Sequence, residues 1–211
     1  MRVAVAPALA GVVRLGIVAC GGASNARHDT RLDAPLAQAE EAARRAPPDE
    51  RQAVRAMYRR LGIDPTKTRP SSEALLRRVK KGDHLPRINT LVDICNWCSL
   101  ECQLPYGLYD LSRIEPPIEL RLGADGEQYE GIRKDAVHVS GRPTLADQRG
   151  AFGNPTSDSA RTMVTEATTE VLCVVFAPAG IAIPELQRVL DLTAGRFQAF
   201  AGAGERGRDV I

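Results

Sequence analysis

The chain has 211 residues, of which 44% are hydrophobic and 4% aromatic, and its net charge is +2. This length accommodates one large domain or two small ones, and the apolar content is sufficient for a buried core. So few aromatic residues argue against a surface that stacks the bases of single-stranded nucleic acid on aromatic rings. We therefore expect a globular protein.

The charge is distributed unevenly along the chain. Residues 51–87 contain 11 basic and three acidic side chains, a net charge of +8, which leaves −6 for the remainder. An excess of this size attracts a polyanion such as RNA. The alternative is that these side chains form the solvated faces of two surface helices.

The N-terminal segment is predicted to form two strands, at residues 3–6 and 12–19, separated by a turn at Pro7. The run that ends at Cys20 resembles a lipoprotein signal only superficially, because Arg14 interrupts its apolar residues. No segment reaches the roughly 18 uninterrupted apolar residues that a membrane span requires. We expect a cytoplasmic protein without a membrane partner.

Three helices are predicted next, at residues 35–45, at residues 49–61 and from Ser71 or Ser72 to Gly82. Their boundaries follow from turn and capping residues, namely Pro47 and Pro48, Asp49 as an N-cap, Ser71 or Ser72 as an N-cap, and the glycines Gly62 and Gly82. The last of these helices directs basic side chains toward solvent.

The central segment, residues 86–110, is predicted to begin with a buried helix. Apolar or small residues recur at the spacing that places them on one helical face: Ile88, Leu91, Val92, Cys95, Cys98, Ser99 and Cys102. Pro86 is compatible with the first turn, while Pro105 and Gly107 end the helix. A second face carries polar side chains that require partners: Asn89, Asp93 and Asn96.

Five cysteines without a secretory signal indicate free thiols. Cys95, Cys98 and Cys102 form a C-x2-C-x3-C series, but a closed metal site requires a fourth ligand, and the histidines lie in separate segments. The same spacing is what a helical core face requires, so we interpret these cysteines as packing residues. We expect no metal and no cofactor.

The C-terminal half is predicted to contain strands at residues 118–122, 128–133, 136–140 and 171–177, followed by a helix at 184–200. A turn at residues 124–127 joins the first two strands. Residues 201–211 are predicted to be a flexible tail. Strands and helices together indicate an α+β fold.

A polar turn precedes the last strand. Gly150 and Gly153 permit close backbone approach, and the following PTSDSART supplies hydroxyls, a carboxylate and a guanidinium within a few residues. This pattern is typical of a pocket wall. An ordinary turn whose side chains cap its own backbone has the same composition, and the residues alone leave both interpretations open.

Three stretches together resemble a known family: PRINTLVDICNWCSLECQLPYGLYDL, then IELRLGADGEQYEGI, then LADQRGAFGNPTSDSART. Their order is similar to the editing module of the phenylalanyl-tRNA synthetase beta subunit, and more closely to the stand-alone B3/B4 domain proteins. The likeness extends from about residue 12 to residue 200. In the family the helix carries Asp-x-Thr-Asn, ends in Gln-Pro and is followed by His-Ala-Phe-Asp; the first of these patterns reads Asp93-Ile94-Cys95-Asn96 in this chain.

The resemblance implies a single B3/B4-like domain over residues 1–200, with a β-sandwich of unusual topology, an adjacent mixed sheet and helices packed outside. It also implies hydrolysis of a mischarged aminoacyl-tRNA ester in trans. The alternative is a non-catalytic module that binds a tRNA end or an amino acid, because the family's pocket histidine falls on Gly107 and its glutamate in Val174–Val175. The sequence contains no GxxxxGK[ST] loop, and aminoacylation is not expected.

The resemblance and the polar turn together define the candidate site residues. The catalytic candidates are Asn96, Asp147 and Asp158. The substrate-binding candidates are Cys95, Gly150, Phe152, Gly153, Thr156, Ser157 and Arg161. The candidates for binding tRNA are Arg69, Arg77, Arg78, Lys80 and Lys81. The expected partner is the aminoacylated 3′ end of a tRNA, and no DNA partner is expected.

Overall fold

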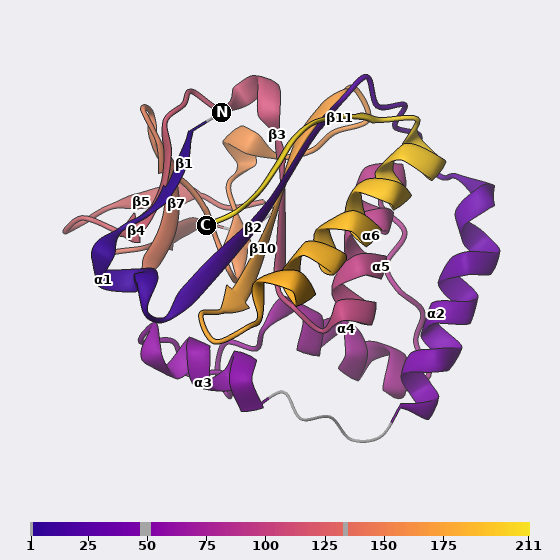
Figure 1. Cartoon of the computed structure of the whole chain (residues 1–211), viewed down its shortest axis with the longest axis horizontal. Helices are drawn as coiled ribbons and strands as arrows, with labels where there is room; N and C mark the ends of the chain where they lie inside the picture. Colours follow the sequence, from indigo (N-terminus) through magenta and orange to yellow (C-terminus); the bar gives the residue numbers. More distant parts are fainter. Residues whose placement is uncertain (1, 47–51, 133–134) are drawn as a thin grey trace.

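The computed structural model describes residues 2–46, 52–132 and 135–211, and its fold is α+β (Figure 1). The helices are α1 (Pro7–Ala10), α2 (Asp33–Arg45), α3 (Gln52–Arg60), α4 (Ser71–Lys80), α5 (Thr90–Cys102) and α6 (Ile183–Ala201). The strands are β1 (Val3–Val5), β2 (Val13–Gly21), β3 (Tyr106–Asp110), β4 (Ile118–Leu122), β5 (Gln128–Glu130), β6 (Ala136–His138), β7 (Pro143–Asp147), β8 (Gly150–Asn154), β9 (Ser157–Asp158), β10 (Glu170–Pro178) and β11 (Gly204–Val210).

The centre of the molecule is an antiparallel sheet with the strand order β11-β2-β10-β3. β2 and β10 are its long inner strands, and almost all of their residues are buried. Continuous apolar runs of this kind are required where both faces of a strand are covered. α6 lies across this sheet (Figure 1) and approaches it closely at Gly16, where a Cβ atom would come within 2.7 Å of Leu190.

A second, five-stranded sheet has the order β1-β4-β7-β8-β9 and is mixed, because β1 and β4 are parallel while the other pairs are antiparallel. A small ribbon of β5 and β6 extends beside it. The helices α2, α4, α5 and α6 gather on the opposite side of the molecule (Figure 1). In the five-stranded sheet, β9 is the edge strand and forms a hairpin with β8. The chain then reaches the first residue of β10, in the central sheet, 12 residues after the end of β9.

α5 begins at Thr90, four residues after Pro86, which differs from the predicted start. Residues 86–88 are extended because the buried carboxylate of Asp93 accepts hydrogen bonds from the Ile88 amide and from the Arg87 guanidinium. Asn89 is the N-cap, its side chain accepting from the Val92 amide. Ile88 therefore lies outside the helix and is 42% exposed, rather than part of the predicted apolar face.

Several other boundaries differ from the sequence predictions. Pro7 starts the short helix α1 instead of a turn. α4 has Pro70 as its N-cap, and neither of the two serines that follow caps it through a side chain. The predicted Asp49 cap, the turn at Pro47–Pro48 and the end of the predicted 128–133 strand lie outside the described residues.

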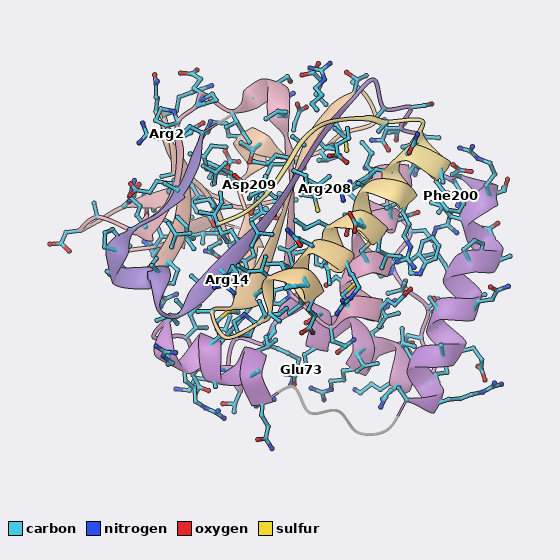
Figure 2. All side chains as sticks on the ribbon, in the orientation of Figure 1. Arg2, Arg14, Glu73, Phe200, Arg208 and Asp209 are labelled. Carbon is cyan, nitrogen blue, oxygen red and sulfur yellow. The ribbon has the colours of Figure 1, made fainter. Side chains whose placement is uncertain are left out.

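The segment predicted to be a flexible tail is ordered in the structure. Gly204–Val210 form the edge strand β11, which pairs with β2. The main chain of Ile211 then exchanges two hydrogen bonds with Leu15. Figure 2 shows Arg208 and Asp209 on this strand beside α6, where Arg208 forms an ion pair with Asp191.

α3 and α4 are joined by ion pairs at the underside of the molecule. Glu73 of α4 accepts from Arg55 of α3 at 2.8 Å and lies 3.4 Å from Arg69 (Figure 2). Across the described ranges, none of the helices is both long and apolar enough to cross a lipid bilayer.

Candidate functional site

A cavity of about 210 Å³ lies where the N-terminus of α4, the start of β3 and the β8–β9 turn meet, and we call it the first cavity. Its lining is polar in large part and comes from segments far apart in the sequence: Ser71, Tyr106, Ile132, Asn154, Pro155, Thr156, Ser157 and Asp158. Three of the predicted site residues are among these, namely Thr156, Ser157 and Asp158.

Asn154 builds the turn that forms one wall of the first cavity. Its side-chain oxygen accepts hydrogen bonds from the amide and the hydroxyl of Thr156, both at 2.8 Å, and from the amide of Ser157 at 2.9 Å. The hydroxyl of Tyr58, on α3, donates to the carbonyl of Pro155 at 2.7 Å. The turn therefore caps its own backbone and also forms the wall of a cavity, so both interpretations of this sequence apply.

Two buried hydroxyls near the turn lack a hydrogen-bond partner of normal geometry within the described residues, those of Ser71 and Tyr109. Ser71 lines the first cavity as the first residue of α4. An unpaired buried hydroxyl costs about 1–3 kcal/mol and requires an explanation. A ligand that accepts or donates a hydrogen bond would provide one for Ser71.

Tyr109 is fully buried, and its ring fills the space between two glycines. A Cβ atom on Gly107 or on Gly153 would overlap the end of this ring, so both positions require glycine as long as Tyr109 keeps this orientation. Phe152 holds the ring edge to face at a centroid distance of 5.0 Å. Burial, and then the nearby carboxylate of Asp158, raise the pKa of Tyr109 well above its ordinary value.

Asp158 is the catalytic candidate that lines the first cavity. It belongs to β9 and pairs with Gly153 of β8 across the hairpin. Its carboxylate also raises the pKa of Tyr129, although burial of that phenol has the larger effect. A carboxylate beside a cavity, next to two phenols that stay protonated, is placed to accept a proton or to orient a water molecule.

Asp147 lies at the end of β7 and binds Arg161 instead of facing the first cavity. Its side chain is fully buried and accepts two hydrogen bonds from the Arg161 guanidinium, both at 2.9 Å. The amides of Glu115 and Arg149 donate to it as well, each at 2.9 Å. Burial alone would raise its pKa, but the hydrogen bonds from Arg161 and these amides lower it. This pair joins β7 to the segment after β9.

The substrate-binding candidates fall into two groups. Gly150, with φ of +104°, and Arg161 line a separate hollow of about 520 Å³ around β5 and β8. Phe152 is fully buried, and the Arg161 guanidinium lies 5.7 Å from its ring centre. Only Thr156 and Ser157 from the predicted substrate-binding set line the first cavity.

Cys95 and Asn96 lie on α5, away from the lining of the first cavity as far as the structure describes it. Cys95 is buried, and its thiol lies against that of Cys173 on β10, which raises the pKa of Cys173. Cys98 is buried beside Arg196 of α6. These two cysteines pack in the core, as predicted. Asn96 is half-buried and makes no side-chain hydrogen bond to any described residue.

The basic candidates lie in the loop before α4, on α4 and at its C-cap, Lys81. Arg69 pairs with Glu73, while Arg78 and Lys80 donate to main-chain carbonyls of His84 and Ala46. Arg77 and Lys81 are exposed. Because α4 begins at the first cavity and rises about 1.5 Å per residue, its basic end lies about one helix length from the cavity.

Ser71, Tyr106 and Asn154 are cavity residues that the sequence did not single out as site residues. Asn154 carries a signal, because Asn-Pro marks a turn and its side chain commonly caps the following amides. Ser71 was predicted only as a helix cap. Tyr106 has no such signal, since its place at the cavity follows from the pairing of β3 with β10.

The sequence matches the model of the B3/4 domain family over residues 53–199, which is most of the chain. The chain belongs to the B3/4 domain family. Among solved structures, this B3/4 domain protein is similar to an N-terminal fragment of the phenylalanyl-tRNA synthetase beta subunit from Pyrococcus horikoshii, with a TM-score of 0.50 and 15% identity. The similarity covers 100% of this chain and 54% of that fragment, so the chain spans about half its length. A comparison with curated proteins finds no match.

These findings confirm the predicted family and the predicted α+β fold of B3/4 type. They also give structural meaning to two positions in this B3/4 domain protein. Gly107, where the family resemblance places a histidine, pairs with Val174, one of the two residues, Val174 and Val175, at which it places the glutamate. The two positions are therefore neighbours in the central sheet, and the Tyr109 ring fills the space that a side chain at Gly107 would need.

Proposed function

We propose that this B3/4 domain protein binds the aminoacylated 3′ end of a tRNA and hydrolyses its ester bond in trans. Family membership and the likeness to part of a phenylalanyl-tRNA synthetase support a tRNA-linked role. The observation that carries the hydrolytic part is the position of the Asp158 carboxylate at a cavity that also contains the unpaired hydroxyl of Ser71.

In this proposal the acyl group enters the first cavity and Asp158 orients a water molecule. The water oxygen adds to the carbonyl carbon while its proton passes to the carboxylate, and the bond between that carbon and the ribose oxygen then breaks. The leaving ribose oxygen takes up the proton. The Ser71 hydroxyl donates to the oxyanion that develops on the carbonyl oxygen.

Asp158 is preferred to Asp147 as the water-orienting group because Asp158 lines the first cavity, whereas Asp147 is not among its lining residues and binds Arg161 and two amides. Asn96 and Cys95 remain candidates that act from α5. The basic side chains of α4 and its preceding loop are proposed to contact the acceptor stem: Arg69, Arg77, Arg78, Lys80 and Lys81.

The test is deacylation of a panel of correctly and incorrectly charged tRNAs by the purified protein and by Asp158→Asn. We expect hydrolysis of one or a few of these esters, and a rate loss of about a hundredfold or more in the variant, as for removal of a general base. Asp125→Asn, at an exposed carboxylate outside the cavity, is the matched control and should keep the wild-type rate. An unchanged rate in Asp158→Asn would exclude this carboxylate, and Asn96→Ala would then test the next candidate.

A second candidate function is non-catalytic binding of a tRNA end. It is favoured by the positions that the resemblance assigns to the family's histidine and glutamate, because Gly107 has no side chain and Val174 is apolar. Absence of turnover across the whole panel, together with measurable tRNA affinity, would establish this function in place of hydrolysis.

A further inference from the structure

A second cavity, of about 450 Å³, adjoins the first cavity on the other side of the β8–β9 turn. The two share one wall, made by Asn154, Thr156 and Ser157. Its remaining lining comes from the loop after α3 and from residues of β6, of the start of β7 and of the segment between these strands. A volume of this size is within the range of cavities that hold small organic ligands.

Two cations line the second cavity, Lys67 and Arg142. Both are exposed, and neither forms an ion pair with any residue that the structure describes. About half of the other exposed arginines in the described ranges do form such pairs, for example Arg31, Arg149 and Arg206. The charge of Lys67 also acts on Asp64, but two cations from separate loops at one cavity indicate a site for an anion.

The one carboxylate among the described lining residues of this cavity is that of Asp64. It accepts hydrogen bonds from the hydroxyl and the amide of Thr66, at 2.7 and 2.9 Å, and these lower its pKa. Asp64 therefore holds the loop that presents Lys67, and the charges of the three side chains sum to +1. The lining also contains apolar groups from Ile63, Val137 and Pro143, against which a base can pack.

We propose that the second cavity binds the nucleotide that precedes the terminal aminoacylated nucleoside, with its phosphodiester between Lys67 and Arg142. The terminal ribose then lies over the shared wall, where the Thr156 hydroxyl, which donates to Asn154, can accept a hydrogen bond from a ribose hydroxyl. This arrangement directs the ester into the first cavity. The single-stranded end crosses the 61–68 loop, and the base of this nucleotide packs against the apolar part of the lining. The inference rests on the proposed function for the identity of the RNA.

The experiment compares the affinity of uncharged tRNA for the wild-type protein, for Lys67→Glu/Arg142→Glu and for the control Arg2→Glu/Arg188→Glu. The control makes the same change of net charge at two exposed arginines that line neither cavity. We expect the Lys67/Arg142 variant to lose affinity by about tenfold or more, and the slope of log affinity against log salt to fall by about 0.7, for one neutralised phosphate of a single strand. The control should keep most of the affinity and the slope.

Equal affinities for the two double variants would overturn the proposal, whatever the protein does to esters. A CCA trinucleotide and the mononucleotide AMP serve as further probes. Weaker binding of CCA by the Lys67/Arg142 variant supports an RNA end as the ligand of the second cavity. If the variant weakens binding of AMP alone, the ligand is a free nucleotide and not an RNA end.

A minimal ester separates this inference from the proposed hydrolysis. Aminoacyl-adenosine carries the ester but no phosphate, so the wild-type protein and the Lys67/Arg142 variant should hydrolyse it at the same rate. Failure of both to hydrolyse it, with tRNA binding still dependent on Lys67 and Arg142, would refute the hydrolase and keep the nucleotide site. If the wild-type protein hydrolyses aminoacyl-adenosine and the Lys67/Arg142 variant does not, the role of Lys67 and Arg142 is not limited to binding phosphate.

Discussion

Glu127 connects three segments through a single carboxylate. Arg121 of β4 donates two hydrogen bonds to it, at 2.7 and 2.8 Å, and the amides of Ala124 and Ala151 donate at 2.7 and 3.2 Å. The Arg121 guanidinium makes the largest contribution to lowering the pKa of Glu127, from an ordinary 4.5 to about 2, against the opposing effect of burial. The charged form is therefore the one that the folded protein stabilises.

This pKa predicts a defined pH dependence of stability. Because the pKa is lower in the folded state, the carboxylate contributes stability above about pH 4.5, and this contribution is lost as the pH falls toward 2. Glu127→Gln should unfold more easily than wild type near pH 6, and the difference should shrink near pH 3, as measured by urea unfolding. A difference that stays constant over this range would show that the charge of Glu127 is not responsible.

Tyr109 illustrates what single residues reveal before a structure is known. Gly153 was predicted to permit a close approach, and it does, but the group that approaches is the Tyr109 ring rather than a substrate. The sequence contains no signal for this contact, because it depends on β3 and β8 facing each other in the folded protein. The capping role of Asn154, by contrast, is local and follows from the residues that come next.

At the scale of elements, α5 depends on its N-cap. Asn89 is buried, its side chain accepts from the Val92 amide at 3.0 Å, and Asn25 accepts from the Leu91 amide in the same first turn. Asn89→Ala should lower the free energy of unfolding by about 1 kcal/mol, within the range of 0.5–2 kcal/mol for lost caps. Thermal or urea unfolding measures this change.

Asn89→Ser is the matched variant for this prediction, because serine retains a side-chain acceptor at the cap. It should be destabilised less than Asn89→Ala. Equal losses in the two variants would assign the effect to packing of the asparagine side chain and not to capping.

The existence and type of most elements follow from the sequence, since apolar periodicity and continuous apolar runs are local properties. The start of α5 does not, because the buried pair of Arg87 and Asp93 holds the preceding residues extended. The first cavity also cannot be derived from a single stretch of sequence, because its lining residues come from segments far apart in the chain. Its Thr156 and Ser157 wall is visible in the sequence, while Ser71 and Tyr106 reach it through the packing of α4 and the pairing of β3.

At the scale of the whole molecule, β11 is the edge strand that pairs with β2 and completes the central sheet. Ala203 is buried, and Val210 and Ile211 pack against the core, although composition favoured a flexible tail. The segment GERGRDVI is polar and rich in glycine, so its order comes from pairing with β2 and not from its own propensity.

Removal of residues 203–211 should destabilise the protein by several kcal/mol, because burial of one Val or Ile side chain alone contributes about 1.5–3 kcal/mol and the edge of β2 would lose its partner. Urea unfolding measures the loss. Val210→Ser/Ile211→Ser, which keeps the strand, separates the side-chain contribution from that of backbone pairing. A truncated protein as stable as the full chain would show that β11 adds no stability.

The order of the strands in the central sheet also bears on synthesis. β2 emerges among the first residues of the growing chain, whereas both of its neighbours, β10 and β11, belong to the last fifth of the sequence. During translation this apolar strand has no native partner until elongation is nearly complete. Incomplete chains thus present an unpaired, aggregation-prone strand, and successful production of this protein depends on protecting it until the C-terminal residues leave the ribosome.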